Sequence, residues 1–128
     1  MLTQLLKRKV EAMEKENIIL SKSMELAVRI VNLYKYLREK SKEKVLPEQL
    51  LRSGTSIGAN VREAMYGQSR NDFISKMSIA LKEAAETEYW LELLKKTEYL
   101  TEEEYESIKT DVCEVSKILT SILKNSRK

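Results

Sequence analysis

The most constraining feature of the sequence is one segment, residues 50–67, that carries two different stripes at helical spacing. An apolar stripe repeats at steps of three and four and consists of Leu50, Gly54, Ile57, Gly58, Val61 and Met65. A second row of short, mostly polar residues consists of Ser53, Ser56, Asn60, Glu63 and Gly67. This spacing predicts a helix with two distinct faces. A solvent-facing row is usually filled with Lys and Glu, whereas hydroxyl and amide groups suit close contact with a helix, a subunit or a ligand.

The rest of the chain also favours helices. Only three Gly and one Pro occur among 128 residues, and the strong helix formers Leu, Glu, Lys, Ala and Met are abundant. This length is enough for one domain with a single core, so we predict an all-α fold. The chain has no apolar run of membrane-spanning length and no signal-peptide pattern. We therefore expect a cytoplasmic protein without membrane contact.

Four helices are predicted. The first spans about 17–41, and the second spans about 47–66, with Pro47 at its first position and Gly67 as a left-handed cap. The third is capped by Ser69, with Asp72 in a capping-box arrangement, and runs to about Tyr99.

The fourth helix begins at the capping box Thr101–Glu104, followed by a heptad seam. The seam consists of Tyr105, Ile108, Val112, Val115, Leu119 and Ile122. Short connections predict an antiparallel, up-down-up-down four-helix bundle over residues 17–125. Residues 1–16 form a more exposed helical extension in this interpretation, and residues 126–128 form a basic tail. Gly54 and Gly58 are expected to pack against the Ala-rich centre of the third helix.

Positive charge gathers in the first third of the chain. The net charge is +3, but residues 1–45 hold eleven Lys and Arg against six acidic residues. A basic helix can attract phosphate backbones, so we name a set of candidate nucleic-acid-binding residues. The set consists of Arg29, Lys35, Arg38, Lys40, Lys42, Lys44, Arg52, Arg62 and Arg70.

The polar row of the second helix has two interpretations. Its hydroxyl and amide groups can bond to backbone carbonyls or neighbouring helices, and this structural role is the preferred one. A ligand-binding role is the alternative. The candidate contact residues, between helices or between subunits, are Ser53, Gly54, Ser56, Gly58, Asn60 and Glu63. Arg52 or Arg62 can pair with acidic residues of the third helix, namely Glu83, Glu86 or Glu88.

Little in the sequence favours catalysis. The chain contains no His, which removes the commonest general base and a common metal ligand. Glu63, Glu83 and Glu86 could gather around a hard cation, but such spacing is commonplace on helices. The single Cys113 lies in an apolar helical pattern and is expected to be a buried, inert thiol. We predict a protein that is not an enzyme and that has no cofactor and no metal.

Four segments of the sequence are similar to a known family. They are 51–64 (LRSGTSIGANVREA), 69–76 (SRNDFISK), 79–84 (IALKEA) and 86–91 (ETEYWL). Through them, residues 17–123 resemble the bacterial four-helix-bundle family first named for proteins encoded in 23S rRNA intervening sequences. The resemblance implies a homopentamer. It also implies kinship with accessory proteins of diversity-generating retroelements, which associate with a reverse transcriptase and bind nucleic acid through basic surfaces. It supplies no catalytic residues.

The leading hypothesis is therefore a non-enzymatic, oligomeric bundle that contacts RNA or DNA phosphates as an accessory factor. The rival hypothesis is a protein-interaction scaffold whose stripes serve only assembly and one protein partner. An enzyme with a carboxylate metal site ranks last.

Overall fold

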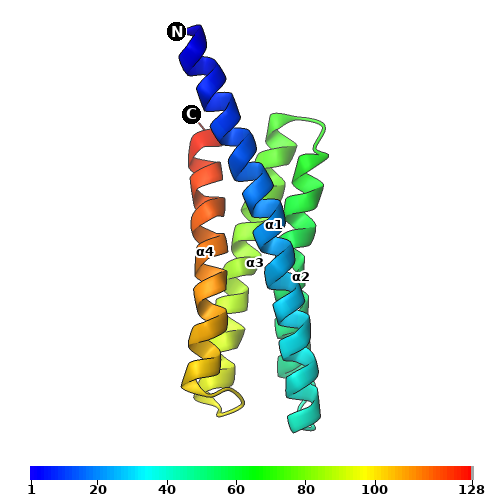
Figure 1. The fold of residues 1–128 in the computed structure, drawn as a ribbon. Coiled ribbons are helices and arrows are strands. Elements are labelled where there is room, and N and C mark those ends of the chain that lie inside the picture. The colour runs from blue at the N-terminus through cyan, green and yellow to red at the C-terminus, as the bar shows by residue number, and fades with distance from the viewer. Residues whose placement is uncertain (128) are drawn as a thin grey trace.

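The protein is an all-helical bundle, described here by a computed structural model for residues 1–127. The helices are α1 (Leu2–Lys40), α2 (Val45–Met65), α3 (Arg70–Lys96) and α4 (Glu102–Ser126). They run alternately up and down, and each packs against its two neighbours in the ring α1–α2–α3–α4 (Figure 1). The predicted antiparallel four-helix bundle is confirmed. None of the described helices is both long and apolar enough to cross a membrane.

Helix α1 is longer than its predicted core segment. It begins at Leu2 and continues without a break for 39 residues. Residues 1–14 are exposed, and Figure 1 shows the beginning of this part projecting past the end of α4. The polar stretch 11–16 lowers burial but contains good helix formers, so the helical conformation continues through it. We call residues 1–14 the N-terminal arm.

Two predicted helix starts are confirmed. Thr101 Oγ1 accepts a hydrogen bond from the Glu104 backbone N–H at 3.1 Å, and Glu104 Oε1 accepts one from the Thr101 N–H at 2.8 Å. This bond from the Thr101 N–H is the largest of the influences that lower the pKa of Glu104. Ser69 caps α3 through the Asp72 N–H at 3.1 Å. The Asp72 carboxylate does not close the box on Ser69, because it accepts the Gln68 N–H instead.

Two predicted helix ends are wrong in detail. Gly67 is not left-handed. A Cβ at this position would lie 3.1 Å from Ala64 O and 3.2 Å from Phe73 N, so a side chain would crowd the tight turn between α2 and α3. At the other end of α3, the helix stops at Lys96 rather than Tyr99.

The residue that takes the left-handed conformation is Glu98, with φ 70°. The backbone N–H of Tyr99 donates to Leu94 O at 2.9 Å, which closes a Schellman-type end. Pro47 also differs from its predicted place, since α2 begins two residues earlier at Val45. Pro47 still lies in the first helical turn, where a missing N–H costs nothing.

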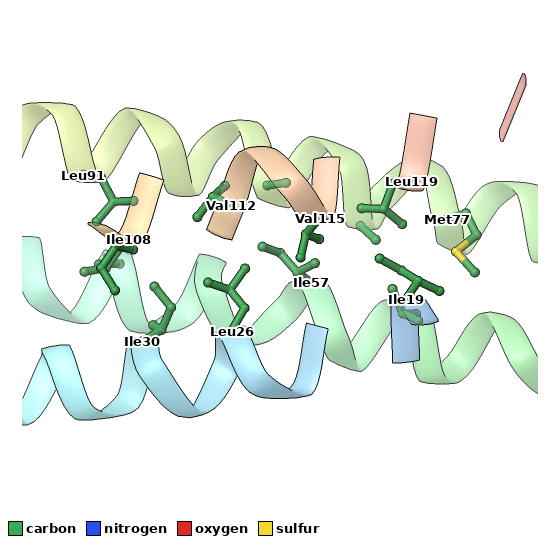
Figure 2. Packing of buried hydrophobic residues seen from close by; sticks show 14 of the residues in the cluster. Ile19, Leu26, Ile30, Ile57, Met77, Leu91, Ile108, Val112, Val115 and Leu119 are labelled. Carbon is green, nitrogen blue, oxygen red and sulfur yellow. The ribbon is translucent and has the colours of Figure 1, made fainter. Parts of the chain in front are cut away.

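The core runs along the bundle axis and takes side chains from all four helices (Figure 2). Every member of the seam predicted for α4 is buried. On α1, Ile19, Leu26 and Ile30 point inward toward this seam. Three polar residues are buried among residues 1–127, namely Ser23, Ser53 and Thr87. Ser23 and Thr87 are polar, so the spacing of apolar residues does not predict that they lie in the interior.

Candidate nucleic-acid and assembly surfaces

The polar row of α2 makes most of its hydrogen bonds within the chain. Ser53 is fully buried, and its Oγ lies 3.1 Å from Thr87 Oγ1 on α3. Ser56 Oγ donates to Arg52 O at 2.7 Å, and Asn60 Nδ2 donates to Ser56 O at 2.8 Å. These bonds to the preceding turn engage the Ser56 and Asn60 side chains within α2. Farther along the row, the exposed Glu63 carboxylate lies 3.5 Å from Lys76 Nζ.

The two helical glycines of α2 face α1, not α3 as predicted. A Cβ on Gly54 would lie 2.7 Å from Ile30 Cγ2, and a Cβ on Gly58 would lie 3.3 Å from Ser23 O. Small residues therefore bring α2 close to α1 at these positions. The side of α2 that meets α3 carries Ser53 instead. Both sides suit close packing, and the sequence alone does not assign either side to a neighbour.

Arg52 is held against α3. Its guanidinium pairs with Glu86 and, at 3.3 Å, with Glu83 Oε2. This pairing was one of those suggested by the sequence. Trp90 Nε1 also donates to Glu86 Oε2 at 2.9 Å, and the exposed Tyr89 ring meets the Trp90 ring edge-on at 5.0 Å. The cluster fixes the outer edge of the α2–α3 contact.

Three more of the predicted basic candidates have partners within the chain. Arg29 pairs with Asp111 on α4 and donates to Ser107 Oγ at 2.9 Å. Arg38 lies 3.9 Å from Glu48, and Lys40 Nζ donates to the Tyr36 hydroxyl at 2.9 Å. That hydrogen bond is the main cause of the raised pKa of Lys40. Phosphate binding by these groups would compete with contacts that already exist.

The other five basic candidates are exposed and take part in none of the ion pairs formed within residues 1–127. The fold separates them into two groups. Lys35, Lys42 and Lys44 lie toward the α1–α2 turn, whereas Arg62 and Arg70 flank the α2–α3 turn at the opposite end of α2 (Figure 1). The 21 residues of α2 place these ends about 30 Å apart.

The two ends differ in their acidic surroundings. The α3–α4 turn lies at the same end as the α1–α2 turn (Figure 1). This turn and the start of α4 carry five glutamates, namely Glu98, Glu102, Glu103, Glu104 and Glu106. Among them, Glu104 raises the pKa of Lys40 through its charge. The positive potential expected from the C-terminal half of α1 is therefore offset by α4.

A groove with no counterpart among the sequence predictions lies between the N-terminal part of α1, the start of α3 and the end of α4. One cavity of about 440 Å³ is lined by Ala12, Lys15, Glu16, Arg70, Phe73, Ile122, Asn125 and Ser126. A second cavity shares Ala12, Lys15 and Asn125 with it and adds Arg8 and Glu11. We call the two together the terminal groove. Its residues are up to 118 positions apart, so no local pattern could have revealed it.

The predicted basic tail is partly visible beside this groove. Ser126 is the last residue of α4, and Arg127 Nη2 donates to Ser78 Oγ on α3 at 3.1 Å. Lys128 lies outside the described residues. With the exposed Lys124, the groove and its surroundings carry cations from α1, α3 and the C-terminal end of α4.

Among residues 1–127 there is neither a cluster of metal-ligating side chains nor an activated cysteine thiol. No group of three or more metal-ligating side chains occurs among residues 1–127. The Cys113 thiol is half-buried and donates to Glu88 Oε1 at 3.1 Å. Burial, followed by the Glu88 carboxylate, raises the pKa of this thiol, which disfavours the reactive thiolate.

Comparisons with known proteins identify the family. No curated protein matches the chain. Among solved structures, a protein of unknown function from the S23 ribosomal protein family of Bacteroides thetaiotaomicron VPI-5482 is 64% identical, with a TM-score of 0.85. The match covers 86% of this chain and 98% of that one. The pattern of the 23S rRNA-intervening sequence proteins matches residues 15–121. The chain therefore belongs to the family of 23S rRNA-intervening sequence proteins.

Proposed function

We propose that the protein is a non-enzymatic, homo-oligomeric bundle that binds RNA or DNA as an accessory factor, through the terminal groove. The observation that carries the proposal is that three cationic residues, Arg8, Lys15 and Arg70, outnumber Glu11 and Glu16 around one groove. The groove also holds the Phe73 ring. Cations bind phosphates without sequence preference, and an aromatic side chain can stack on an unpaired base. Asn125 and Ser126 add hydrogen-bonding groups.

Assembly into a homo-oligomer has separate support. Met24 and Val28 on α1 are about half exposed, and they continue the apolar side of the helix beyond Leu20. Beside this stripe, Thr55, Gly58 and Ala59 of α2 help to line a shallow groove of about 240 Å³. Exposed apolar side chains next to small residues are suited to a subunit contact. A ring of several copies would also multiply the net charge of +3 and strengthen attraction to phosphates.

The nucleic-acid proposal is tested by fluorescence anisotropy with single-stranded RNA, a structured RNA and duplex DNA. With three to five phosphate contacts, raising salt from 50 to 200 mM should weaken binding about 20- to 500-fold, least for single strands and most for duplex DNA. The double variant Lys15→Glu/Arg70→Glu should lose binding at every salt concentration.

The matched control reverses the same number of charges at the other end of the bundle, in Lys35→Glu/Lys42→Glu. It should bind as the unmodified protein does. If only this control loses binding, the site is at the α1–α2 end and the groove is wrong. Absence of binding by the unmodified protein at 50 mM salt would remove the nucleic-acid function altogether.

Light scattering tests the assembly. A pentamer would have a solution mass near five times the 14.9 kDa of the chain. The rival function is a protein-interaction scaffold with no nucleic-acid role, and the exposed α1 stripe favours it. It predicts a stoichiometric partner that stays bound after nuclease treatment of a lysate, together with no retention of RNA or DNA.

A further inference from the structure

The N-terminal arm is a helix with few tertiary contacts. Its residues are exposed, and Arg8, Glu11 and Ala12 meet the end of α4 only across the terminal groove. The arm is about 20 Å long, and its first turns project past the bundle (Figure 1). A helix of this length is marginally stable in water unless an apolar face is packed against something. The arm also precedes residue 15, where the match to the family begins. A binding partner for the arm would supply the packing that the bundle does not.

The arm carries an apolar seam of its own. Leu6, Val10 and Met13 are each more than half exposed, and the steps of four and three between them continue to Asn17 and Leu20. These are the steps of a coiled-coil heptad. The seam is separate from the core face of α1, because Met13 lies about 120° around the helix from Ile19.

Charged residues flank the seam in a self-complementary order. Lys7 and Glu14 lie on one flank, directly after Leu6 and Met13. Lys9 and Glu16 lie on the other flank, directly before Val10 and Asn17. Each flank is therefore basic toward the N-terminus and acidic toward the bundle. Two antiparallel copies of such a helix place basic ends against acidic ends.

One register satisfies both the seam and the charges. When Val10 is opposite Met13 of a second copy, Lys7 faces Glu14 and Lys9 faces Glu16, and the symmetry gives four opposite-charge pairs. A slip of one heptad in one direction sets lysine against lysine, and a slip in the other sets glutamate against glutamate. Two parallel helices would keep only two opposite-charge contacts, both between Lys9 of one copy and Glu14 of the other. Like charges in contact disfavour the alternative registers.

We propose that the N-terminal arm pairs with the arm of a second copy of this chain, as an antiparallel two-helix coiled coil centred on Val10 and Met13. The pairing does not depend on nucleic-acid binding or on contacts between bundles. A second copy explains the charge order better than an anionic membrane does, because Glu11, Glu14 and Glu16 would be repelled by such a surface.

The test uses full-length protein with Cys113→Ser and two complementary arms. One variant has an acidic arm (Lys7→Glu/Lys9→Glu) and carries Val10→Cys. The other has a basic arm (Glu14→Lys/Glu16→Lys) and carries Met13→Cys. After mild oxidation, the mixture should give a disulfide-linked heterodimer, since positions 10 and 13 face each other in the proposed register. Without the cysteine substitutions, either charged arm alone should associate on the order of 100-fold more weakly than the unmodified arm.

Each remaining outcome counts against the proposal. If the mixture yields no heterodimer, the arms do not pair in this way. If Val10→Cys in an otherwise unmodified arm links to itself as fast as to Met13→Cys, the pairing is parallel. If the unmodified protein binds phosphatidylglycerol vesicles and shows no cross-link, the occupant is a membrane. Positions 7, 9, 10, 13 and 14 are exposed, whereas Glu16 is partly buried beside the terminal groove. The melting of the bundle is therefore measured for each variant and serves as the folding control.

Discussion

The two sides of α2 are packed against their neighbours by different means. Toward α1, the helix presents glycines, and α1 fills the space that a side chain would occupy. The missing Cβ of Gly54 would overlap Ile30, which is fully buried and branched at Cβ and therefore cannot easily turn away. The two helices can therefore lie close together because Gly54 has no side chain.

Toward α3, the same helix presents polar groups that reach across the contact. Ser53 meets Thr87 inside the bundle, and Arg52 meets Glu83 and Glu86 at its edge. Overlap between packed atoms is costly, a neutral buried hydrogen bond contributes moderately, and a partly exposed ion pair contributes little. We therefore expect the bundle to tolerate substitutions on the α3 side of α2 far better than substitutions on its α1 side.

The largest expected effect comes from filling the glycine position against α1. Gly54→Val should lower the free energy of unfolding by about 3 kcal/mol, because its side chain collides with Ile30 in a closely packed core. Urea unfolding followed by circular dichroism, at fixed protein concentration, measures this loss.

Ile30→Ala in the Gly54→Val background separates this collision from the low helix propensity of valine. Removal of the Ile30 side chain makes room, so the double variant should be more stable than the sum of the two single losses predicts, by about 1 kcal/mol or more. Strictly additive losses would mean that contact with Ile30 is not the cause.

An intermediate effect is expected from the buried hydroxyl pair. Thr87→Val should lower the free energy of unfolding by about 1 kcal/mol, because it removes the group that Ser53 contacts. Adding Ser53→Ala should cost little more, since replacing both partners by apolar groups leaves no unpaired hydroxyl at this contact. A double variant that loses twice as much as Thr87→Val would show that the hydroxyls act independently. Thermal melting of the four proteins in this cycle gives the answer.

The smallest effect is expected from the edge of the α3 contact. Arg52→Ala should cost about 0.5 kcal/mol at low salt, because the guanidinium is nearly half exposed and water screens its pairs. The cost should shrink further in 1 M salt. Arg62→Ala is the matched control on the same helix, since Arg62 has no ion pair within residues 1–127, and it should leave stability unchanged. A loss of 2 kcal/mol or more for Arg52→Ala would reverse the ranking of the two sides.

Features that depend on one or two helical turns were predictable. The Thr101–Glu104 capping box is formed by residues three positions apart, and the α4 seam follows from spacing alone. The left-handed cap was predictable only in kind. A glycine usually takes the left-handed conformation, but Glu98 takes it here. Gly67 lies instead where the end of α2 and the start of α3 are so close that a side chain would be crowded.

The sequence predicted which types of residue form the candidate surfaces, but not where in the fold these residues lie. Spacing marked Gly54 and Gly58 as contact residues but assigned them to α3 instead of α1. Composition marked a basic N-terminal third, yet Arg29 is engaged by Asp111, 82 positions away. The terminal groove joins Lys15 to Arg70 and Asn125, and residues so far apart are brought together only when the helices pack.

Three properties follow from the sequence alone. The chain forms four amphipathic helices, and the buried stripe of α4 can be named. Apart from the N-terminal arm, the first residue of each helix can be predicted to within a few positions. These properties follow from backbone propensity, capping groups and periodicity, which act within a few residues. The tertiary structure decided which helix each stripe meets, which cations remain free and where they gather. Those properties depend on the rotation and neighbours of each helix, which are fixed by packing of the whole core at once.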